Sequence, residues 1–174
     1  MLRLFVGVDL PPELKLRLSL LASGLPGAKW VDAGNYHLSL RFIGEVDEGM
    51  AADIDAALLQ VRAPRFDVTL ATIGHFGLRT LWVGVERNPA LQHLHEKVES
   101  ALGRMGLAPE ERRYTPHVTL ARLKGTTEGR LQGYLGEHAL FRAPSFPVDH
   151  FSLVASYLTK SGAIYEDQAD YRLG

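Results

Sequence analysis

The sequence contains no cysteine, and its positive and negative charges nearly cancel. Without cysteine, neither disulfide bonds nor thiolate metal sites can form. No apolar run reaches the length of about eighteen residues that a membrane-spanning helix needs. The first residues, MLRLFVGVDLPPE, contain an acid and two prolines, which does not match a secretory signal. We therefore expect a cytoplasmic protein with no membrane span.

The small net charge also limits the kinds of partner. The formal net charge is −1, whereas a protein that coats long nucleic acid needs a basic stripe. This argument does not exclude recognition of a single phosphate or of one nucleic-acid end. A chain of 174 residues is long enough for one sizeable core, or for two small lobes that share one.

The chain contains an internal repeat. Residues 5–9 read FVGVD and residues 82–86 read WVGVE, and each is a short apolar segment that ends in an acid. Each is followed by a helical pattern that opens on proline, which suits the first turn of a helix. Gly24 and Gly106 follow these two patterns, where a left-handed cap residue is favoured.

The two halves stay in register over the following residues. His37 in HLSL and His117 in HVTL lie 80 residues apart, and so do Pro64 and Pro144. Helical patterns lie between these points, over roughly 48–61 and 127–138. The sequence predicts two β-α-β-α-β units, roughly residues 2–80 and 79–174, within a single bilobal domain spanning residues 1–174. We expect an α+β fold with a pseudo-twofold axis, two mainly antiparallel sheets flanking a central cleft, and helices outside.

Each repeated motif places a histidine and a hydroxyl on one surface. Side chains alternate along a strand, so His37 and Ser39 share one face while their leucine neighbours face the core. The same argument pairs His117 with Thr119. A pseudo-twofold would set the two pairs facing each other across a cleft.

Two imidazoles and two hydroxyls suit chemistry at a phosphodiester. The ordinary pKa of histidine lies near neutrality, so one ring can act as general acid and the other as general base. The hydroxyls can donate to phosphate oxygens, and no acidic cluster accompanies the histidines as it would at a metal site. Alternatively, both histidines are packed strand residues that an old duplication preserved. A third motif, HFSL at His150, lies outside the repeat register, and we expect it to be structural.

The segments around these motifs resemble a known family. LRLFVGVDLPPEL, WVDAGNYHLSLRFIGEV, FGLRTLWVGVE and ERRYTPHVTLARLKG resemble members of the 2H phosphoesterase superfamily, in particular the bacterial RNA 2′,3′-cyclic phosphodiesterases, also called 2′-5′ RNA ligases. The resemblance implies hydrolysis of an RNA or nucleoside 2′,3′-cyclic phosphate to a 2′-phosphomonoester, without metal or other cofactor. It also implies possible reversible 2′-5′ ligation of RNA ends.

The resemblance assigns roles to five residues. His37 would be the general acid, His117 the general base, and Ser39 and Thr119 would hold the phosphate oxygens. Arg122 would supply positive charge to the phosphate, yet strict alternation places it on the face opposite His117, so a bulge or strand end is needed.

Some neighbouring residues receive no functional role. Arg41 lies four positions after His37, so strict alternation places it on the same face, but the second repeat has no equivalent arginine. We expect Arg41 to lie in solvent at the end of its strand. Nearby aromatic residues could stack on a base, but the sequence singles none of them out; they are Tyr36, Phe42, Phe76 and Tyr114.

Other functions stay open at this point. The chain could act on a 2′-5′ oligonucleotide or on another small cyclic phosphate such as an ADP-ribose cyclic phosphate. It could bind RNA ends without turnover, or it could be a hydrolase with a histidine-bound metal. We expect RNA ends or nucleotides with a 2′,3′-cyclic phosphate as partners. We also expect a monomer, because the sequence shows no long apolar stripe that would be exposed to a partner.

Overall fold

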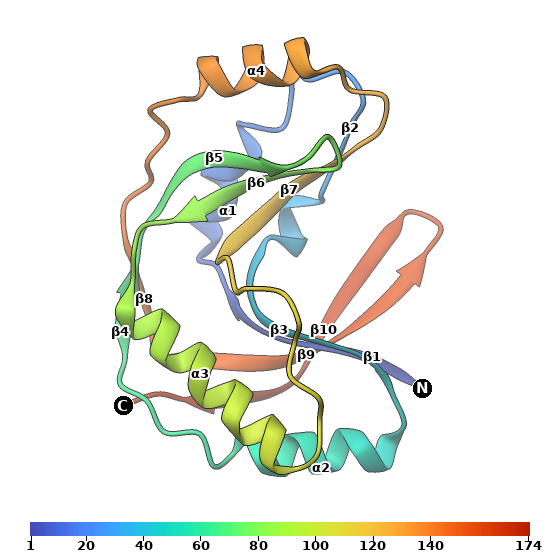
Figure 1. The fold of residues 1–174 in the computed structure, drawn as a ribbon, viewed down its shortest axis with the longest axis vertical. Coiled ribbons are helices and arrows are strands. Elements are labelled where there is room, and N and C mark those ends of the chain that lie inside the picture. Colours follow the sequence, from blue (N-terminus) through green and yellow to red (C-terminus); the bar gives the residue numbers. More distant parts are fainter.

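Two four-stranded sheets and one two-stranded sheet form the β structure, and the computed structural model describes residues 1–174 (Figure 1). We call the first the His37 sheet; its strands, in spatial order, are β10 (Gly162–Arg172), β9 (His150–Thr159), β1 (Leu2–Asp9) and β3 (His37–Val46). We call the second the His117 sheet; its strands are β2 (Ala28–Trp30), β7 (His117–Leu123), β6 (Thr80–Val85) and β5 (Leu70–Phe76). Every pairing in both sheets is antiparallel.

The two-stranded sheet shows the symmetry of the repeat. Strand β4 (Phe66–Val68) pairs antiparallel with β8 (Phe146–Val148), and Asp67 lies opposite Pro147. These two residues are separated by the same 80 positions as His37 and His117. Equivalent strands therefore meet each other at this point, as they do at a pseudo-twofold axis.

The helices cover the outer faces of the sheets. Helices α2 (Glu48–Leu58) and α3 (Pro89–Arg104) contact each other, and α3 contacts β3 of the His37 sheet. Helices α1 (Pro12–Ser19) and α4 (Glu128–Glu137) lie beside the His117 sheet in Figure 1. Tyr134 of α4 donates its hydroxyl to the carbonyl of Leu21, just after α1, at 2.7 Å. The predicted α+β fold with two antiparallel sheets and outer helices is therefore confirmed.

The lobes do not coincide with the sequence repeats. The His37 sheet takes β1 and β3 from the first repeat and β9 and β10 from the second, while β5 of the first repeat joins the His117 sheet. Helix α1 follows a strand of one sheet and lies beside the other (Figure 1). The two repeats are thus interleaved, and each sheet needs strands from both halves of the chain.

The local signals in the sequence set the helix boundaries. Pro12 and Pro89 stand in the first turn of α1 and α3, and the side chain of Asn88 accepts from the main-chain N–H of Leu91 at 3.0 Å. Gly106 directly follows Met105, the C-cap of α3, and adopts φ of +106°, as the expected left-handed cap position requires. Gly24 also has a positive φ of +79°, but the C-cap of α1 is already Leu20, so Gly24 lies in the following turn and does not cap the helix. The buried face of α3 comprises Leu91, Leu94, Val98, Ala101 and Leu102.

Several elements escape the sequence patterns. Strands β2 and β5 and the short 3-10 helix η1 (Ala33–Asn35) were not predicted, and they are short or contain glycine. The core is one cluster of 39 buried residues that extends through both sheets. No helix of the chain is long and apolar enough to cross a membrane.

Candidate active site

The two motifs occupy equivalent places at the entrance of β3 and β7. His37 and His117 are the first residues of these strands. The apolar neighbours in the motifs are fully or almost fully buried; they are Leu38, Leu40, Val118 and Leu120. The histidines and the hydroxyl residues Ser39 and Thr119 are only partly buried. Each strand therefore presents an imidazole and a hydroxyl on the face opposite the core, as alternation predicted.

The His37 ring is held on both of its nitrogens. Its Nδ1 lies 2.8 Å from the carbonyl oxygen of Asn35, and its Nε2 lies 2.9 Å from the hydroxyl of Ser39. A carbonyl can only accept, so Nδ1 carries a proton. In the neutral ring Nε2 then accepts from Ser39, and in the protonated ring Nε2 donates instead. Phe5 stacks on the ring at 4.4 Å, and Tyr165 meets it edge-on at 5.0 Å.

The His117 ring is held in the same way. Its Nδ1 lies 2.6 Å from the carbonyl oxygen of Thr115, so Nε2 is the nitrogen that can exchange a proton with a ligand. Phe76 meets the ring edge-on at 5.1 Å, and Trp82 lies 5.7 Å away. Trp82 and Phe5 begin the repeated segments WVGVE and FVGVD, so the repeat supplies each histidine with an equivalent aromatic neighbour.

Contacts and charges connect the two motifs across the cleft. Tyr114, just before β7, donates its hydroxyl to the carbonyl of Ser39 at 2.9 Å. Burial is the main cause that lowers the pKa of His37, and the positive charge of protonated His117 lowers it further. A charge on His117 therefore acts on His37.

Burial favours the neutral form of both catalytic candidates in the free protein. Burial lowers the pKa of His37 and of His117 from the ordinary value of 6.5, and the carbonyl partners of their Nδ1 atoms oppose this only in part. Arg122 lowers the pKa of His117 further. An anion bound between the rings would raise both pKa values, because it stabilises the imidazolium form.

A β-bulge brings Arg122 to the same face as His117. In the β6–β7 ladder Leu81 lies opposite Ala121 and Trp82 lies opposite Thr119, so Leu120 is an extra residue. Leu120 and Ala121 are consecutive and both buried, after which Arg122 is exposed. Burial raises the pKa of Tyr165, the residue against His37, and the Arg122 charge opposes that rise. The guanidinium thus acts on groups of both sheets, as expected of a residue in the cleft.

The expectation for Arg41 was wrong. Its side chain is buried, its Nη1 lies 2.9 Å from Glu99 of α3, and its Nη2 donates to the carbonyl of Ala108 at 2.6 Å. A bulge in β3 at Leu40, equivalent to that at Leu120, turns Arg41 to the helix side. Arg41 therefore ties β3 to α3 and the loop after it, instead of ending a strand in solvent.

Three further histidines lie outside the two motifs. The ring of His95 stacks on Tyr114 at 3.9 Å and its Nδ1 is buried without a hydrogen-bond partner. His75 lies in β5, with Nδ1 2.8 Å from the carbonyl of Gly77. His150 begins β9 and pairs with Asp149 at 2.6 Å, consistent with a structural role.

A cavity of about 410 Å³ adjoins His37 on the same face of the sheet. Strands β1, β9 and β10 and the segment around η1 line it, and Asn35 donates to the carbonyl of Ala163 at 2.7 Å across its end. The acids Asp9, Glu166 and Asp167 lie in its wall, and Lys15 is paired with Asp9 at 2.9 Å. The sequence did not reveal this cavity, because it forms between segments that are more than a hundred positions apart in the chain.

The four aromatic residues near the motifs differ in their exposure. Tyr36 is buried in the core, Tyr114 is partly buried, and Phe42 and Phe76 are exposed at the cleft faces of β3 and β5. Sequence reasoning missed Phe5, Trp82 and Tyr165 beside the histidines, although the repeated FVGVD and WVGVE segments carried a signal for the first two. No group of three or more His, Cys, Asp or Glu side chains is placed to hold a metal ion.

Two sheets that each present an imidazole and a hydroxyl on the face opposite the core, from equivalent places in a repeated sequence, define a duplicated two-histidine protein of the phosphoesterase type. The chain belongs to the 2′-5′ RNA ligase superfamily, whose family model matches residues 11–159.

Individual relatives agree with this assignment. The chain is 39% identical over 158 residues to an RNA 2′,3′-cyclic phosphodiesterase of Aeropyrum pernix, covering 87% of this chain and 89% of that relative. It is 34% identical to a protein of the same name from Thermotoga maritima, covering 95% and 92% of the two chains. The crystal structure of E. coli LigT complexed with 3′-AMP superposes with a TM-score of 0.82 at 26% identity, covering 99% of this chain and 98% of that one.

Proposed function

We propose that this protein hydrolyses the 2′,3′-cyclic phosphate of an RNA end or a nucleoside to a 2′-phosphomonoester. The observation that carries the proposal is the pair of equivalent imidazole–hydroxyl sets, His37 with Ser39 and His117 with Thr119, each on the face of its sheet opposite the core. The family and the names of the relatives support the same reaction.

The arrangement divides the reaction between the two rings. His117 accepts a proton from water at Nε2 while the water oxygen attacks phosphorus. The bond between phosphorus and O3′ breaks, and His37 donates the proton on its Nε2 to O3′. The proton count balances, because His117 gains the proton that His37 loses, and solvent resets both rings.

The hydroxyls and Arg122 serve the phosphate oxygens. When His37 is protonated, its Nε2 no longer accepts from Ser39, so the Ser39 hydroxyl is free to donate to a non-bridging oxygen. Thr119 does the same from the other sheet, and Arg122 supplies a positive charge that compensates the charge on the phosphate. No step in this scheme passes through a metal ion or an organic cofactor.

Ligation uses the same bond breakage with another nucleophile. If the 5′-hydroxyl of a second RNA replaces water, the P–O3′ bond breaks as before and a 2′-5′ phosphodiester forms. The name of the family gives this second candidate its support. We further propose that the protein acts in the cytoplasm as a monomer on RNA ends or nucleotides.

The decisive experiment identifies the product. Purified protein is incubated in EDTA with a nucleoside 2′,3′-cyclic phosphate and with an RNA that carries the same end, and ³¹P NMR locates the phosphate. We expect turnover to the 2′-phosphomonoester with and without chelator. Tight binding of the 2′-phosphate without any turnover would instead identify a binding module, and loss of turnover in EDTA would identify a metal hydrolase.

A further inference from the structure

Two cations lie directly opposite each other beside the proposed phosphate site. Lys29 in the edge strand β2 pairs across the ladder with Arg122 in β7, and both residues are exposed. Residues directly opposite in an antiparallel pair share a face of the sheet. The next residue, Trp30, packs on the other face, since its ring lies 6.0 Å from that of Tyr134 in α4. Lys29 therefore points to the cleft face, next to Arg122.

This pair lacks the carboxylate that would balance it. Like charges directly opposite each other destabilise a strand pair, and neither Lys29 nor Arg122 forms an ion pair with an acid. By contrast, Arg3 on the cleft face of β1 lies opposite Glu45 of β3. A bound anion would relieve the repulsion between Lys29 and Arg122, which makes their position a favourable one for a second phosphate.

The charge of the cavity wall beside His37 indicates the direction in which an RNA strand leaves the site. The cavity beside His37 carries Asp9, Glu166 and Asp167, and its Lys15 is already paired with Asp9. That wall repels a phosphodiester backbone, whereas the edge formed by β2 and β7 attracts one. A strand whose terminal phosphate lies between the histidines is therefore drawn along the His117 sheet toward Lys29.

We propose that Lys29, which lies beside Arg122, binds the phosphodiester immediately 5′ to the terminal nucleotide of an RNA substrate, while Arg122 serves the terminal phosphate. This inference rests on the proposed function, and it adds that the site prefers RNA ends over mononucleotides. A mononucleoside cyclic phosphate has no second phosphate and cannot use Lys29.

The test compares two substrates in the variant Lys29→Gln. The substrates are a mononucleoside 2′,3′-cyclic phosphate and a short RNA with the same terminal nucleotide. We expect the ratio of kcat/KM for the RNA to that for the mononucleotide to fall by up to about fivefold, mainly through KM, as for loss of one exposed charge contact. The slope of log Kd against log salt concentration for the RNA should become shallower by about 0.7. An unchanged ratio and slope would overturn the proposal.

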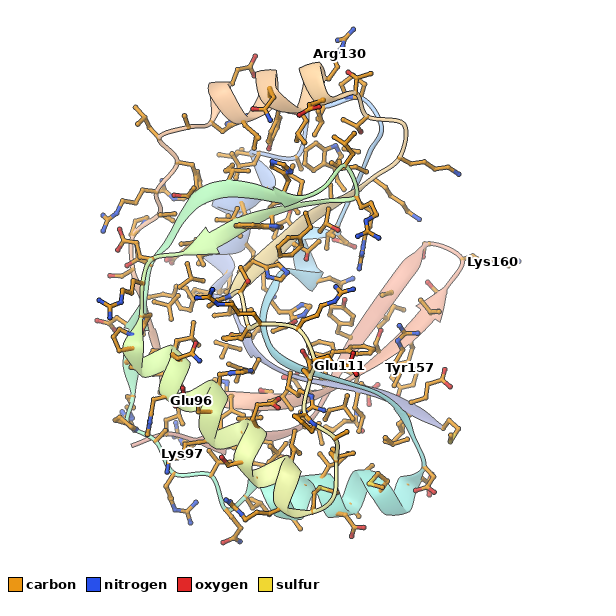
Figure 2. The ribbon with its side chains drawn as sticks, viewed as in Figure 1. Glu96, Lys97, Glu111, Arg130, Tyr157 and Lys160 are labelled. Carbon is orange, nitrogen blue, oxygen red and sulfur yellow. The ribbon has the colours of Figure 1, made fainter.

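A matched variant controls for net charge. Lys97→Gln removes the same charge from α3, on the outer side of the molecule (Figure 2), and should leave the ratio unchanged. Arg3→Gln tests the other route out of the cleft. If Arg3→Gln lowers the ratio and Lys29→Gln does not, the strand leaves along β1 and the inference is wrong.

Binding separates this inference from the proposed function. The Kd of a fluorescently labelled RNA that ends in a 2′-phosphate is measured by anisotropy for the wild type, Lys29→Gln and the control Lys97→Gln. If the wild type turns over neither substrate, the proposed function fails, but a selective rise of this Kd in Lys29→Gln would still support the backbone site. If the wild type turns over both substrates and Lys29→Gln changes neither the ratio nor this Kd, the backbone site alone fails.

Discussion

Each imidazole is held through Nδ1 by a main-chain carbonyl two residues before it, Asn35 for His37 and Thr115 for His117. This hydrogen bond sets the tautomer and leaves Nε2 as the reactive nitrogen. The aromatic neighbours Phe5 and Trp82 restrict the rings and reduce their contact with water. The Nδ1 hydrogen bond therefore orients each ring and by itself raises its pKa, whereas burial lowers the pKa.

Removal of either imidazole should abolish most of the turnover. We expect His37→Gln and His117→Gln each to lower kcat by about a hundred- to ten-thousand-fold, the usual contribution of a general acid or base. Steady-state kinetics with a 2′,3′-cyclic nucleotide measures the loss, and circular dichroism checks that the variants fold.

The third motif provides the control for these variants. His150→Gln removes a histidine from HFSL, but His150 pairs with Asp149 and has no equivalent in the other repeat. We expect wild-type kcat for this variant. Full activity in His117→Gln, or a large loss in His150→Gln, would contradict the assignment of the motifs.

The pH optimum of kcat/KM should lie below the ordinary pKa of histidine, which is about 6.5. Burial lowers the pKa of both His37 and His117 below 6.5 in the free protein. Since kcat/KM reports the free enzyme, its bell-shaped profile should have its maximum below pH 6.5. The bound phosphate raises both pKa values, so the profile of kcat should be displaced to higher pH. Coincident profiles of the two parameters, centred above pH 7, would show that the desolvation argument is wrong.

At the scale of elements, two equivalent bulges decide which side chains face the cleft. The bulge at Leu120 turns Arg122 to the face of His117, and the bulge at Leu40 turns Arg41 to the core side and leaves Phe42 exposed. The same type of bulge therefore exposes a cation, Arg122, in one sheet and an aromatic ring, Phe42, in the other. The difference lies only in the residues that occupy the positions.

Strand β5 provides the space for the aromatic neighbour of His117. Gly74 lies opposite Trp82, and a Cβ atom added at Gly74 would overlap the indole ring carbons. We expect Gly74→Ala to lower the free energy of unfolding by about 1–3 kcal/mol, the usual cost of overpacking. The displaced Trp82 should also disturb His117 and reduce kcat. Urea unfolding followed by tryptophan fluorescence measures the first effect.

A second glycine gives the matched control. Gly103 in α3 has no atom within 4 Å of an added Cβ, so Gly103→Ala introduces the same methyl group without a clash. We expect a gain of up to about 1 kcal/mol, because alanine favours a helix over glycine. Equal effects of the two substitutions would rule out the contact between Gly74 and Trp82 as the cause.

At the scale of the whole molecule, the repeats are interleaved. Each sheet contains strands of both repeats, and the repeats meet where β4 pairs with β8. Neither lobe can therefore be completed by one half of the chain. The long β9–β10 hairpin extends from the His37 sheet without a counterpart, with Lys160 at its tip and Tyr157 on its flank (Figure 2).

The stability of the molecule should fall as the medium becomes acidic. Burial lowers the pKa of His37, His95 and His117 in the folded state, so the unfolded chain binds more protons once the pH falls below about 6.5. The histidine contribution to the free energy of unfolding should decrease as pH falls through this value and be complete below their folded-state pKa values. Urea unfolding at a series of pH values measures the slope.

One substitution isolates a single contribution to this slope. His95→Phe keeps an aromatic ring against Tyr114 and removes the titrating nitrogens, one of which is buried without a partner. The slope should be reduced by up to one proton, about 1.4 kcal/mol per pH unit. An unchanged slope in this variant would show that His95 is protonated equally in the folded and unfolded chain.

Local patterns predicted much of the fold and part of the site. Apolar spacing, the prolines at the start of helices and the glycines after them predicted the four helices, because these signals act within a few residues. The register of the repeat also selected His37 and His117 over His150. The faces of Arg41 and Arg122 could not be obtained in this way, since a bulge depends on how a strand pairs with its neighbour.

From the residues alone it follows that two equivalent strands each carry an imidazole and a hydroxyl opposite their buried side, since alternation along a strand is a local property of the backbone. Only the tertiary structure decides that strands from both repeats form each sheet, that the bulges redirect Arg122 and Arg41, and that Lys29 stands beside Arg122. These depend on which strands pair and in what register, and that choice is made by burial of the whole core.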